Sequence, residues 1–312
     1  MRAVNKISNK VIINDVLCAA AAVEKNLIVL CSDSRGSASL EPFAKKFPAQ
    51  FVEVGIAEQN LVSIAAGMAA CGKRPFVFSP ASFLSTRAVD QVKVDVGYSH
   101  TNVKLVGIAG GVSYGDLGST HQAVNDFATF ASTAGLRVYV PCDRFQTEKL
   151  FRALLQDDEP AYIRIGRNPV DAVYSEDFPF ALNRATTIRD GSDVTIIACG
   201  ELVQYAKVAG ELLAEKNISA RVLDMHCLKP IDAAAIIKAA AETKFIVTVE
   251  EHVKIGGLGS MVAQIVAENS PTKVFSLTLP DAPVIPAVPE KIFKHYGLDA
   301  AGIVEKILVL KK

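Results

Sequence analysis

Short apolar runs alternate with longer segments in which apolar residues recur at helical spacing along most of the chain. The runs at 26–34, 74–80 and 103–111 are bounded by turn-forming residues, which is typical of buried strands. The segments 11–25 and 57–72 carry the helical spacing. Because strands this apolar must be covered on both faces, the pattern predicts an α/β fold with a mainly parallel sheet and helices outside it.

The alternation stops between residues 168 and 192 and then resumes. This stretch holds two prolines, several acids and no clean period, so it predicts a linker with one edge strand. Beyond it, strand-like and helix-like segments alternate again and predict a second, smaller α/β domain. We therefore predict a first domain at 1–175, a linker at 176–190 and a second domain at 191–312.

Composition narrows the classes of protein to be considered. Lys plus Arg equals Asp plus Glu at 33 each, so no net charge favours nucleic acid or an anionic membrane. The six cysteines are scattered without a C-x-x-C pair, which indicates reduced thiols and a cytoplasmic protein. Residues 1–11 lack the apolar core of a secretory signal. A neutral chain that is 50% hydrophobic is also a candidate for burying surface against a partner.

A carboxylate stands where a predicted strand turns into a predicted helix. Glu58 follows the strand-like run 50–56 and falls in the first turn of the helix-like segment 57–72. Ligands of open α/β sheets bind beyond the carboxyl ends of the strands, so the position suits a site. An acid in a first helical turn also complements the helix dipole, and from the residues alone this simpler interpretation is favoured. Glu53, on the strand itself, is interpreted as structural.

Longer motifs carry a resemblance to a known family. The run VGIAEQNLVSIAAGMA at 54–69 resembles transketolase, and further similar motifs follow in the family's order at 85–91, 118–128, 139–149, 162–169 and 222–232. The resemblance spans nearly the whole chain but covers only the second half of a full-length transketolase. The G-D-G motif, with which the family's first domain holds the metal ion and the cofactor's diphosphate, does not occur here.

The resemblance implies the C-terminal subunit of a split transketolase, built from a pyrimidine-binding domain and a transketolase C-terminal domain. A separate N-terminal subunit would hold the diphosphate of thiamine diphosphate with Mg²⁺ or Ca²⁺, in an α2β2 assembly. The expected activity is transfer of a two-carbon ketol unit from a ketose phosphate to an aldose phosphate, as in the pentose phosphate pathway. This chain alone is expected to be inactive.

The same resemblance implies roles for individual residues. Glu58 matches the glutamate that exchanges a proton with the aminopyrimidine ring, and burial among apolar residues suits that exchange. Phe83, or Phe78 as an alternative, would stack on that ring, although an ordinary place in the core is equally compatible with Phe83. His121 matches a histidine near the substrate hydroxyls and could relay protons.

The substrate-binding residues are also implied, with two departures from the family. Arg167 matches an arginine that grips the sugar phosphate, whereas Arg164 is interpreted as part of a surface salt bridge. Ser34 and Ser37, with Arg35 between them, would line the channel. Leu117 stands where many transketolases have an aspartate that binds a substrate hydroxyl, and neighbouring Asp116 would take over that role. Ala109 stands where the family has a phosphate-binding histidine.

Other functions stay open at the level of sequence. The beta subunit of a thiamine-dependent 2-oxoacid dehydrogenase shares the two-domain plan, but motifs such as AEQN are more similar to transketolase. Deoxyxylulose-phosphate synthase is a close relative that is normally one chain, and a non-catalytic α/β subunit is the alternative without enzyme activity. The glycine-rich segment 249–260 is expected to be a loop, and His226, His252 and His295 lack metal-ligand spacing.

Overall fold

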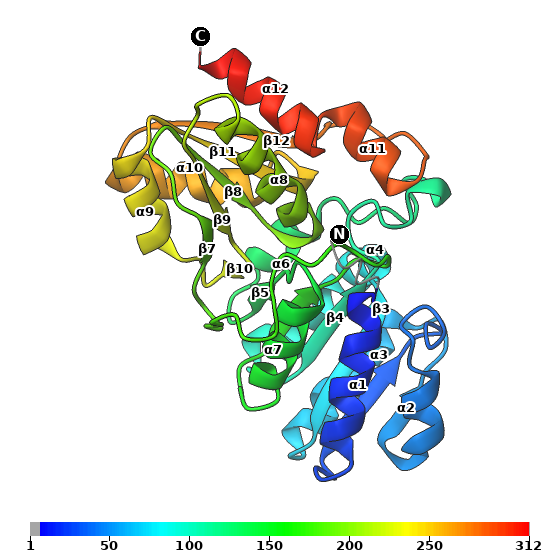
Figure 1. The fold of residues 1–312 in the computed structure, drawn as a ribbon. Helices are drawn as coiled ribbons and strands as arrows, with labels where there is room; N and C mark the ends of the chain where they lie inside the picture. The colour runs from blue at the N-terminus through cyan, green and yellow to red at the C-terminus, as the bar shows by residue number, and fades with distance from the viewer. Residues whose placement is uncertain (1–6, 312) are drawn as a thin grey trace.

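The structure is a computed structural model that describes residues 7–311, in which two α/β units lie against each other (Figure 1). The first contains a seven-stranded sheet whose strands pair in parallel except at one edge, where β10 is antiparallel to β5. Its order is β10 (Cys227–Lys229), β5 (Arg137–Tyr139), β6 (Ala161–Arg164), β4 (Lys104–Ile108), β3 (Arg74–Pro80), β1 (Leu27–Cys31), β2 (Phe51–Glu53).

The second unit contains a five-stranded sheet. Its order is β12 (Lys273–Leu279), β11 (Phe245–Val253), β8 (Val194–Ala198), β9 (Ala220–Asp224), β7 (Thr186–Arg189). Only the edge strand β7 pairs antiparallel in this sheet of the described chain, and it lies in the stretch where the sequence predicted an edge strand. That prediction and the predicted α/β class are confirmed.

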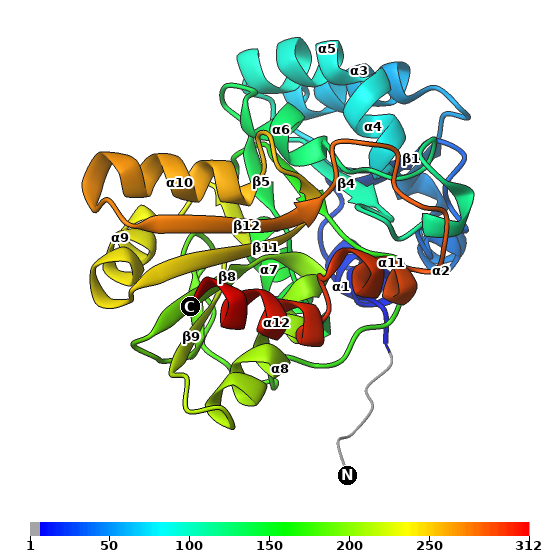
Figure 2. The ribbon, with the colours of Figure 1, turned by 90° about the horizontal axis from the view of Figure 1, so that it is seen from above.

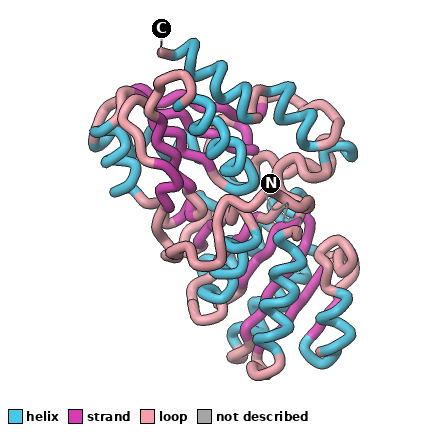
Figure 3. Tube along the Cα trace, viewed as in Figure 1, coloured by secondary structure: helices cyan, strands magenta, loops and turns pink. Residues whose placement is uncertain are grey.

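Helices cover both faces of each sheet, as the apolar strands require (Figures 2 and 3). In the first unit α1 packs with α7 on one face, while α3 and α4 pack on the strands from the other face. In the second unit α8 pairs with α12 and α9 pairs with α10 on opposite faces. The helices are α1 (Asn9–Ala21), α2 (Glu41–Lys46), α3 (Glu58–Ala70), α4 (Ala81–Arg87), α5 (Val89–Gln91), α6 (Asp126–Ala131), α7 (Arg144–Leu154), α8 (Val203–Ala214), α9 (Ala233–Glu242), α10 (Leu258–Asn269), α11 (Pro289–Tyr296) and α12 (Ala300–Leu310).

The two units share a sheet, hydrogen bonds and a hydrophobic core, in addition to the linker that joins them. Strand β10 comes from the C-terminal part of the chain but completes the first sheet, and Val140 N donates to His226 O at 2.7 Å beside it. Lys229 adds hydrogen bonds from Nζ to Ala131 O and Thr133 O, at 2.9 and 2.5 Å. The main hydrophobic core contains buried side chains from both parts of the chain. Packing is therefore continuous across the predicted domain boundaries.

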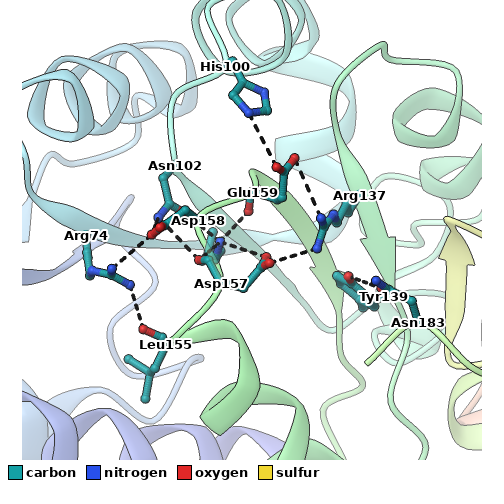
Figure 4. Close-up of polar contacts among 11 residues, drawn as sticks. Arg74, His100, Asn102, Arg137, Tyr139, Leu155, Asp157, Asp158, Glu159 and Asn183 are labelled. Carbon is teal, nitrogen blue, oxygen red and sulfur yellow. Dashed lines mark hydrogen bonds and ion pairs between the residues drawn. The ribbon is translucent and has the colours of Figure 1, made fainter. Parts of the chain in front are cut away.

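A network of polar contacts lies at the amino ends of β4, β5 and β6 in the first sheet (Figure 4). Lys104 is buried there, and its Nζ donates to Asn102 Oδ1 at 2.6 Å, to Asp157 O at 2.9 Å and to Glu159 O. Arg137 donates to Asp157 Oδ1 at 2.9 Å. Burial lowers the pKa of Lys104 to about 8, partly offset by the charge of Asp157. This end of the sheet is occupied by stabilising contacts, which leaves the carboxyl end for a site.

Two expectations from the sequence are corrected, and one lies partly outside the described residues. Segment 249–260 is only partly a loop, because β11 runs to Val253 and α10 begins at Leu258. Arg164 is an ion-paired residue, but it is buried rather than at the surface. No helix within residues 7–311 has the length and apolarity needed to cross a bilayer. Residues 1–6, the start of the segment assessed for a secretory signal, lie outside the described residues.

Candidate active site

Most of the site residues predicted from sequence follow the carboxyl ends of strands in the seven-stranded sheet. Ser34 follows β1, Glu58 follows β2 and Phe83 lies on α4 directly after β3. His121 belongs to the loop between β4 and α6, and Arg167 follows β6. Parallel strands present these ends at the same edge of the sheet, so residues far apart in sequence are brought to one rim.

Glu58 opens helix α3 and is 4% exposed. Both carboxylate oxygens accept a hydrogen bond from Arg87 Nη1, at 3.1 Å each. The carboxylate borders an open hollow of about 540 Å³, whose walls are Ile56, Ala57, Glu58, Gln59, Asn60 and Arg87. Glu58 is thus a buried acid at the edge of a hollow, and its carboxylate is paired with one half-exposed arginine.

A row of side chains runs from Glu58 to Arg167 along the rim. The guanidinium carbon of Arg87 lies 4.1 Å from the centre of the Phe83 ring. Next, the His121 ring lies edge-on to Phe83, with 5.2 Å between ring centres. The His121 ring also lies edge-on to Tyr114, with 5.8 Å between ring centres. The row ends at Arg167, whose guanidinium carbon lies 4.9 Å from the centre of the Tyr114 ring. Glu58, Phe83, His121 and Arg167 thus belong to one continuous set of contacts.

The loop that carries His121 is held by its own backbone. Gly111 and Ala123 form a two-way backbone bridge, and His121 N donates to Gly118 O at 3.0 Å. Gly118 has φ +73°, a left-handed conformation that glycine adopts without strain. The Oγ1 of Thr120 lies 2.9 Å from Nδ1 of His121, so Thr120 engages this nitrogen and Nε2 remains for a ligand. This arrangement suits a histidine that holds or moves a proton.

The remaining predicted residues differ in how they face the rim. Phe78 is fully buried in β3, so it presents no face to a ligand, whereas Phe83 is half-buried at the rim. Ser34 is buried and donates to Phe78 O at 3.1 Å. Ser37 and Asp116 are exposed, as is Leu117 beside Asp116. Phe83 is therefore better placed than Phe78 to stack on a ring.

Lys10 is a candidate that the sequence did not reveal. It lies on α1, and its Nζ donates to Ser37 O at 3.0 Å. Burial and the nearby positive charge of Arg167 lower the pKa of Lys10, while Glu41 raises it. Within residues 7–311, no carboxylate forms an ion pair with Arg167. The charge of Lys10 therefore adds to that of Arg167 at this part of the rim, which favours anions such as phosphate over cations.

Arg164 connects the rim to the second unit of the chain. It donates from Nη1 to Asp126 Oδ1 at 3.3 Å and from Nη2 to Glu251 Oε2 at 2.9 Å. The other Glu251 oxygen accepts from Val112 N at 2.8 Å, in the loop that leads to His121. Burial raises the pKa of Glu251, and the Arg164 charge opposes that rise. Arg164 is therefore a positioning residue of the junction rather than a surface ion pair.

Comparison with known proteins agrees with this geometry. Residues 5–171 match the family described as "Transketolase, pyrimidine binding domain", and residues 183–303 match "Transketolase, C-terminal domain". The chain belongs to the transketolase family. The resemblance inferred from the motifs is thereby confirmed, as is the two-domain fold that it implied.

Separate transketolase subunits are among the most similar proteins. The chain is 47% identical over 309 residues to an apulose-4-phosphate transketolase subunit of Phocaeicola vulgatus, with 99% of both chains covered. It is 36% identical over 290 residues to a 6-deoxy-6-sulfo-D-fructose transketolase subunit of Clostridium sp., covering 93% of this chain and 90% of that subunit.

Solved structures give the same result. A split gene transketolase described as an inactive beta4 tetramer superposes with a TM-score of 0.87 at 36% identity, covering 98% of this chain and 99% of that one. The transketolase of Campylobacter jejuni superposes with a TM-score of 0.82 at 16% identity, which shows the fold alone. This chain spans 47% of that longer transketolase.

The residues at the rim fit one end of the family's cofactor, thiamine diphosphate. A buried carboxylate beside a hollow of about 540 Å³ suits a ring nitrogen, and the half-buried Phe83 offers an aromatic face for stacking. In the described part of the chain, no group of three or more His, Cys, Asp or Glu side chains is placed to hold a metal ion. The observed fit is to the aminopyrimidine end of the cofactor.

Proposed function

We propose that the chain is the C-terminal subunit of a two-chain, thiamine-diphosphate-dependent transketolase. It transfers a two-carbon ketol unit from a ketose phosphate to an aldose phosphate. The observation that supports this most directly is the row of contacts joining Glu58, Phe83 and His121 at one rim, in a chain of the transketolase family. The bound cofactor would supply stabilisation of a carbanion next to a carbonyl carbon.

In this proposal Glu58 holds a proton at the cofactor's pyrimidine nitrogen. The carboxylate is buried at the wall of the hollow, and both of its oxygens accept from Arg87. The ring of Phe83 would support the pyrimidine by stacking. His121, with Nδ1 engaged by Thr120, directs Nε2 at the substrate hydroxyls and moves a proton there.

The substrate phosphate binds at the cationic end of the row. Arg167 offers a planar fork of donors. Lys10 on α1 donates to Ser37 O in the loop after β1, and burial and the charge of Arg167 lower the pKa of Lys10. Asp116, exposed next to Leu117, reads a substrate hydroxyl in place of the aspartate that Leu117 replaces. The methyl side chain of Ala109 cannot donate to phosphate, and in this proposal Lys10 provides part of the binding that a histidine side chain would provide.

A separate N-terminal subunit would hold the diphosphate with Mg²⁺ or Ca²⁺. The absence of a metal-binding cluster in the described residues of this chain is compatible with that division. Two copies of each chain would form an α2β2 assembly in the cytoplasm. The relatives named as separate transketolase subunits support this arrangement.

The donor is proposed to be a ketose phosphate or a similar anionic ketose. The names of two relatives suggest the first compounds to test, apulose 4-phosphate and 6-deoxy-6-sulfo-D-fructose. Both carry an anionic group, which suits the pair of cations at Arg167 and Lys10. Fructose 6-phosphate and xylulose 5-phosphate complete the panel as donors of the general transketolase reaction.

Reconstitution with the N-terminal subunit tests the proposal. The complex should transfer a ketol unit from at least one donor, and the isolated chain should not. Glu58→Gln should lower the maximal rate by about 10²–10⁴-fold, the usual contribution of an acid–base group. Glu148→Gln, at an exposed ion pair on α7, is the matched control and should leave the rate unchanged.

Full activity of Glu58→Gln would refute the role of Glu58. Oxidative decarboxylation of pyruvate without ketol transfer would instead indicate a 2-oxoacid dehydrogenase subunit.

A further inference from the structure

Arg87 makes both of the contacts that the proposed cofactor ring requires. Its Nη1 donates to the two oxygens of Glu58, at 3.1 Å each, and its guanidinium lies over the Phe83 ring at 4.1 Å. The guanidinium is planar, carries hydrogen-bond donors and stacks on aromatic faces. In these respects it resembles an aminopyrimidine ring that shares a proton with Glu58 while stacking on Phe83.

The position of Arg87 allows its side chain to move away from Glu58 and Phe83. The residue ends the short helix α4, four positions after Phe83, and its side chain is 46% exposed whereas Glu58 is 4% exposed. Arg87 also forms part of the wall of the hollow beside Glu58. Rotation of the Arg87 side chain would therefore expose Glu58 and the face of Phe83 together, without movement of α3 or α4.

We propose that Arg87 is an internal occupant of the pyrimidine position, which closes the site in the free subunit and is displaced when the cofactor binds. This inference rests on the proposed function. A site that is open for only a fraction of the time binds its ligand more weakly by that fraction. Arg87 therefore sets the concentration of thiamine diphosphate that the assembled enzyme needs, and keeps a buried carboxylate paired until assembly.

The first test needs neither partner nor cofactor. In the isolated chain, carboxyl groups are labelled with a water-soluble carbodiimide and an amine, and labelling is followed by peptide mass spectrometry. Arg87→Ala should increase labelling of Glu58 severalfold, while Glu148 serves as an internal reference. Arg152→Ala removes an exposed pair with Glu148 and should leave Glu58 unchanged. Arg87→Lys keeps the charge but loses the planar stack, so it should give an intermediate value.

The second test uses the complex reconstituted with the N-terminal subunit, titrated with thiamine diphosphate at fixed Mg²⁺. Arg87→Ala should lower the half-saturating concentration by roughly three- to tenfold, whatever its effect on the maximal rate. A higher half-saturating concentration would show that Arg87 holds the cofactor, and would overturn the inference. Unchanged labelling of Glu58 in the isolated chain would overturn it independently. If the wild-type complex transfers no ketol unit, the proposed function fails, and the labelling result still decides whether Arg87 covers Glu58.

Discussion

Replacing Arg164 by methionine removes the cation at the junction of the two units. The side chain forms ion pairs with Asp126 and Glu251, donates to Glu251 O at 2.9 Å, and lies over the Phe127 ring at 4.5 Å. Methionine has a similar length and retains the apolar contacts. The change therefore isolates the loss of charge and hydrogen bonds, and leaves two buried carboxylates without their counter-ion.

Breaking a buried pair by removing one partner costs about 3–5 kcal/mol, because the remaining charge stays buried without compensation. Asp126 retains the hydroxyl of Tyr162 at 2.7 Å, and Glu251 retains Val112 N at 2.8 Å. We therefore expect a loss near the lower end of that range, about 3 kcal/mol in the free energy of unfolding at pH 8. The loss should shrink toward pH 5, because without Arg164 the buried Glu251 can take up a proton in the folded state and the unfavourable charge disappears.

Urea denaturation of the isolated chain measures this difference, provided that the slope against denaturant stays constant between variants. Arg152→Met is the matched control, since Arg152 forms an exposed pair with Glu148 and such pairs contribute about 0–1 kcal/mol. Adding Glu251→Gln to Arg164→Met should recover part of the loss. A change below about 1 kcal/mol at pH 8 would refute the assignment of Arg164 as a buried junction residue.

Three further predictions concern stability. Gly111→Ala should cost more than about 2 kcal/mol in urea denaturation, because Gly111 has φ +60° and an added Cβ would lie 2.0 Å from Arg164 Nη2. Asp143→Ala should cost roughly 2–4 kcal/mol in the same assay, because its carboxylate caps α7 through Gln146 N and accepts from Val173 N and Tyr174 N. Burial raises the pKa of Asp224 to about 7, so the folded chain retains a proton that the unfolded chain releases. The free energy of unfolding should therefore fall by a few kcal/mol, on the order of 3, as pH rises from 4 to 7, and Asp224→Asn should flatten that slope in a pH series of denaturation curves.

The local pattern of apolar residues was sufficient to predict several strands and helices of the fold. The run 74–80 coincides with β3, and the run 103–111 contains β4, because each is a short apolar segment bounded by turn-forming residues. The helix-like segment 57–72 contains α3 with Glu58 at its first position. The place of Glu58, after a strand and in the first turn of a helix, depends only on neighbouring residues in the sequence. It could therefore be inferred without the tertiary structure.

Non-local pairing could not be inferred in the same way. Strands β5 and β10 are only three residues long, too short to show a period, and they lie far apart in the sequence. Arg164 in the segment AYIRIG has no local sign of burial, because its partners come from residues 126 and 251. Lys10 gave no sequence signal either. Arg87 did give one, since it follows Phe83 by one helical turn, a spacing at which side chains contact each other.

The C-terminal unit supplies none of the proposed site residues, yet its contacts fix where they lie. Glu251 binds both Arg164, at the end of the strand that leads to Arg167, and Val112 N, in the loop that leads to His121. From the same unit, Ala287 N donates to Gly115 O at 3.2 Å in that loop. A histidine on a loop keeps a useful direction only if the loop has one conformation. The junction therefore restricts the loop from two sides, and damage there should reduce catalysis before it unfolds the chain.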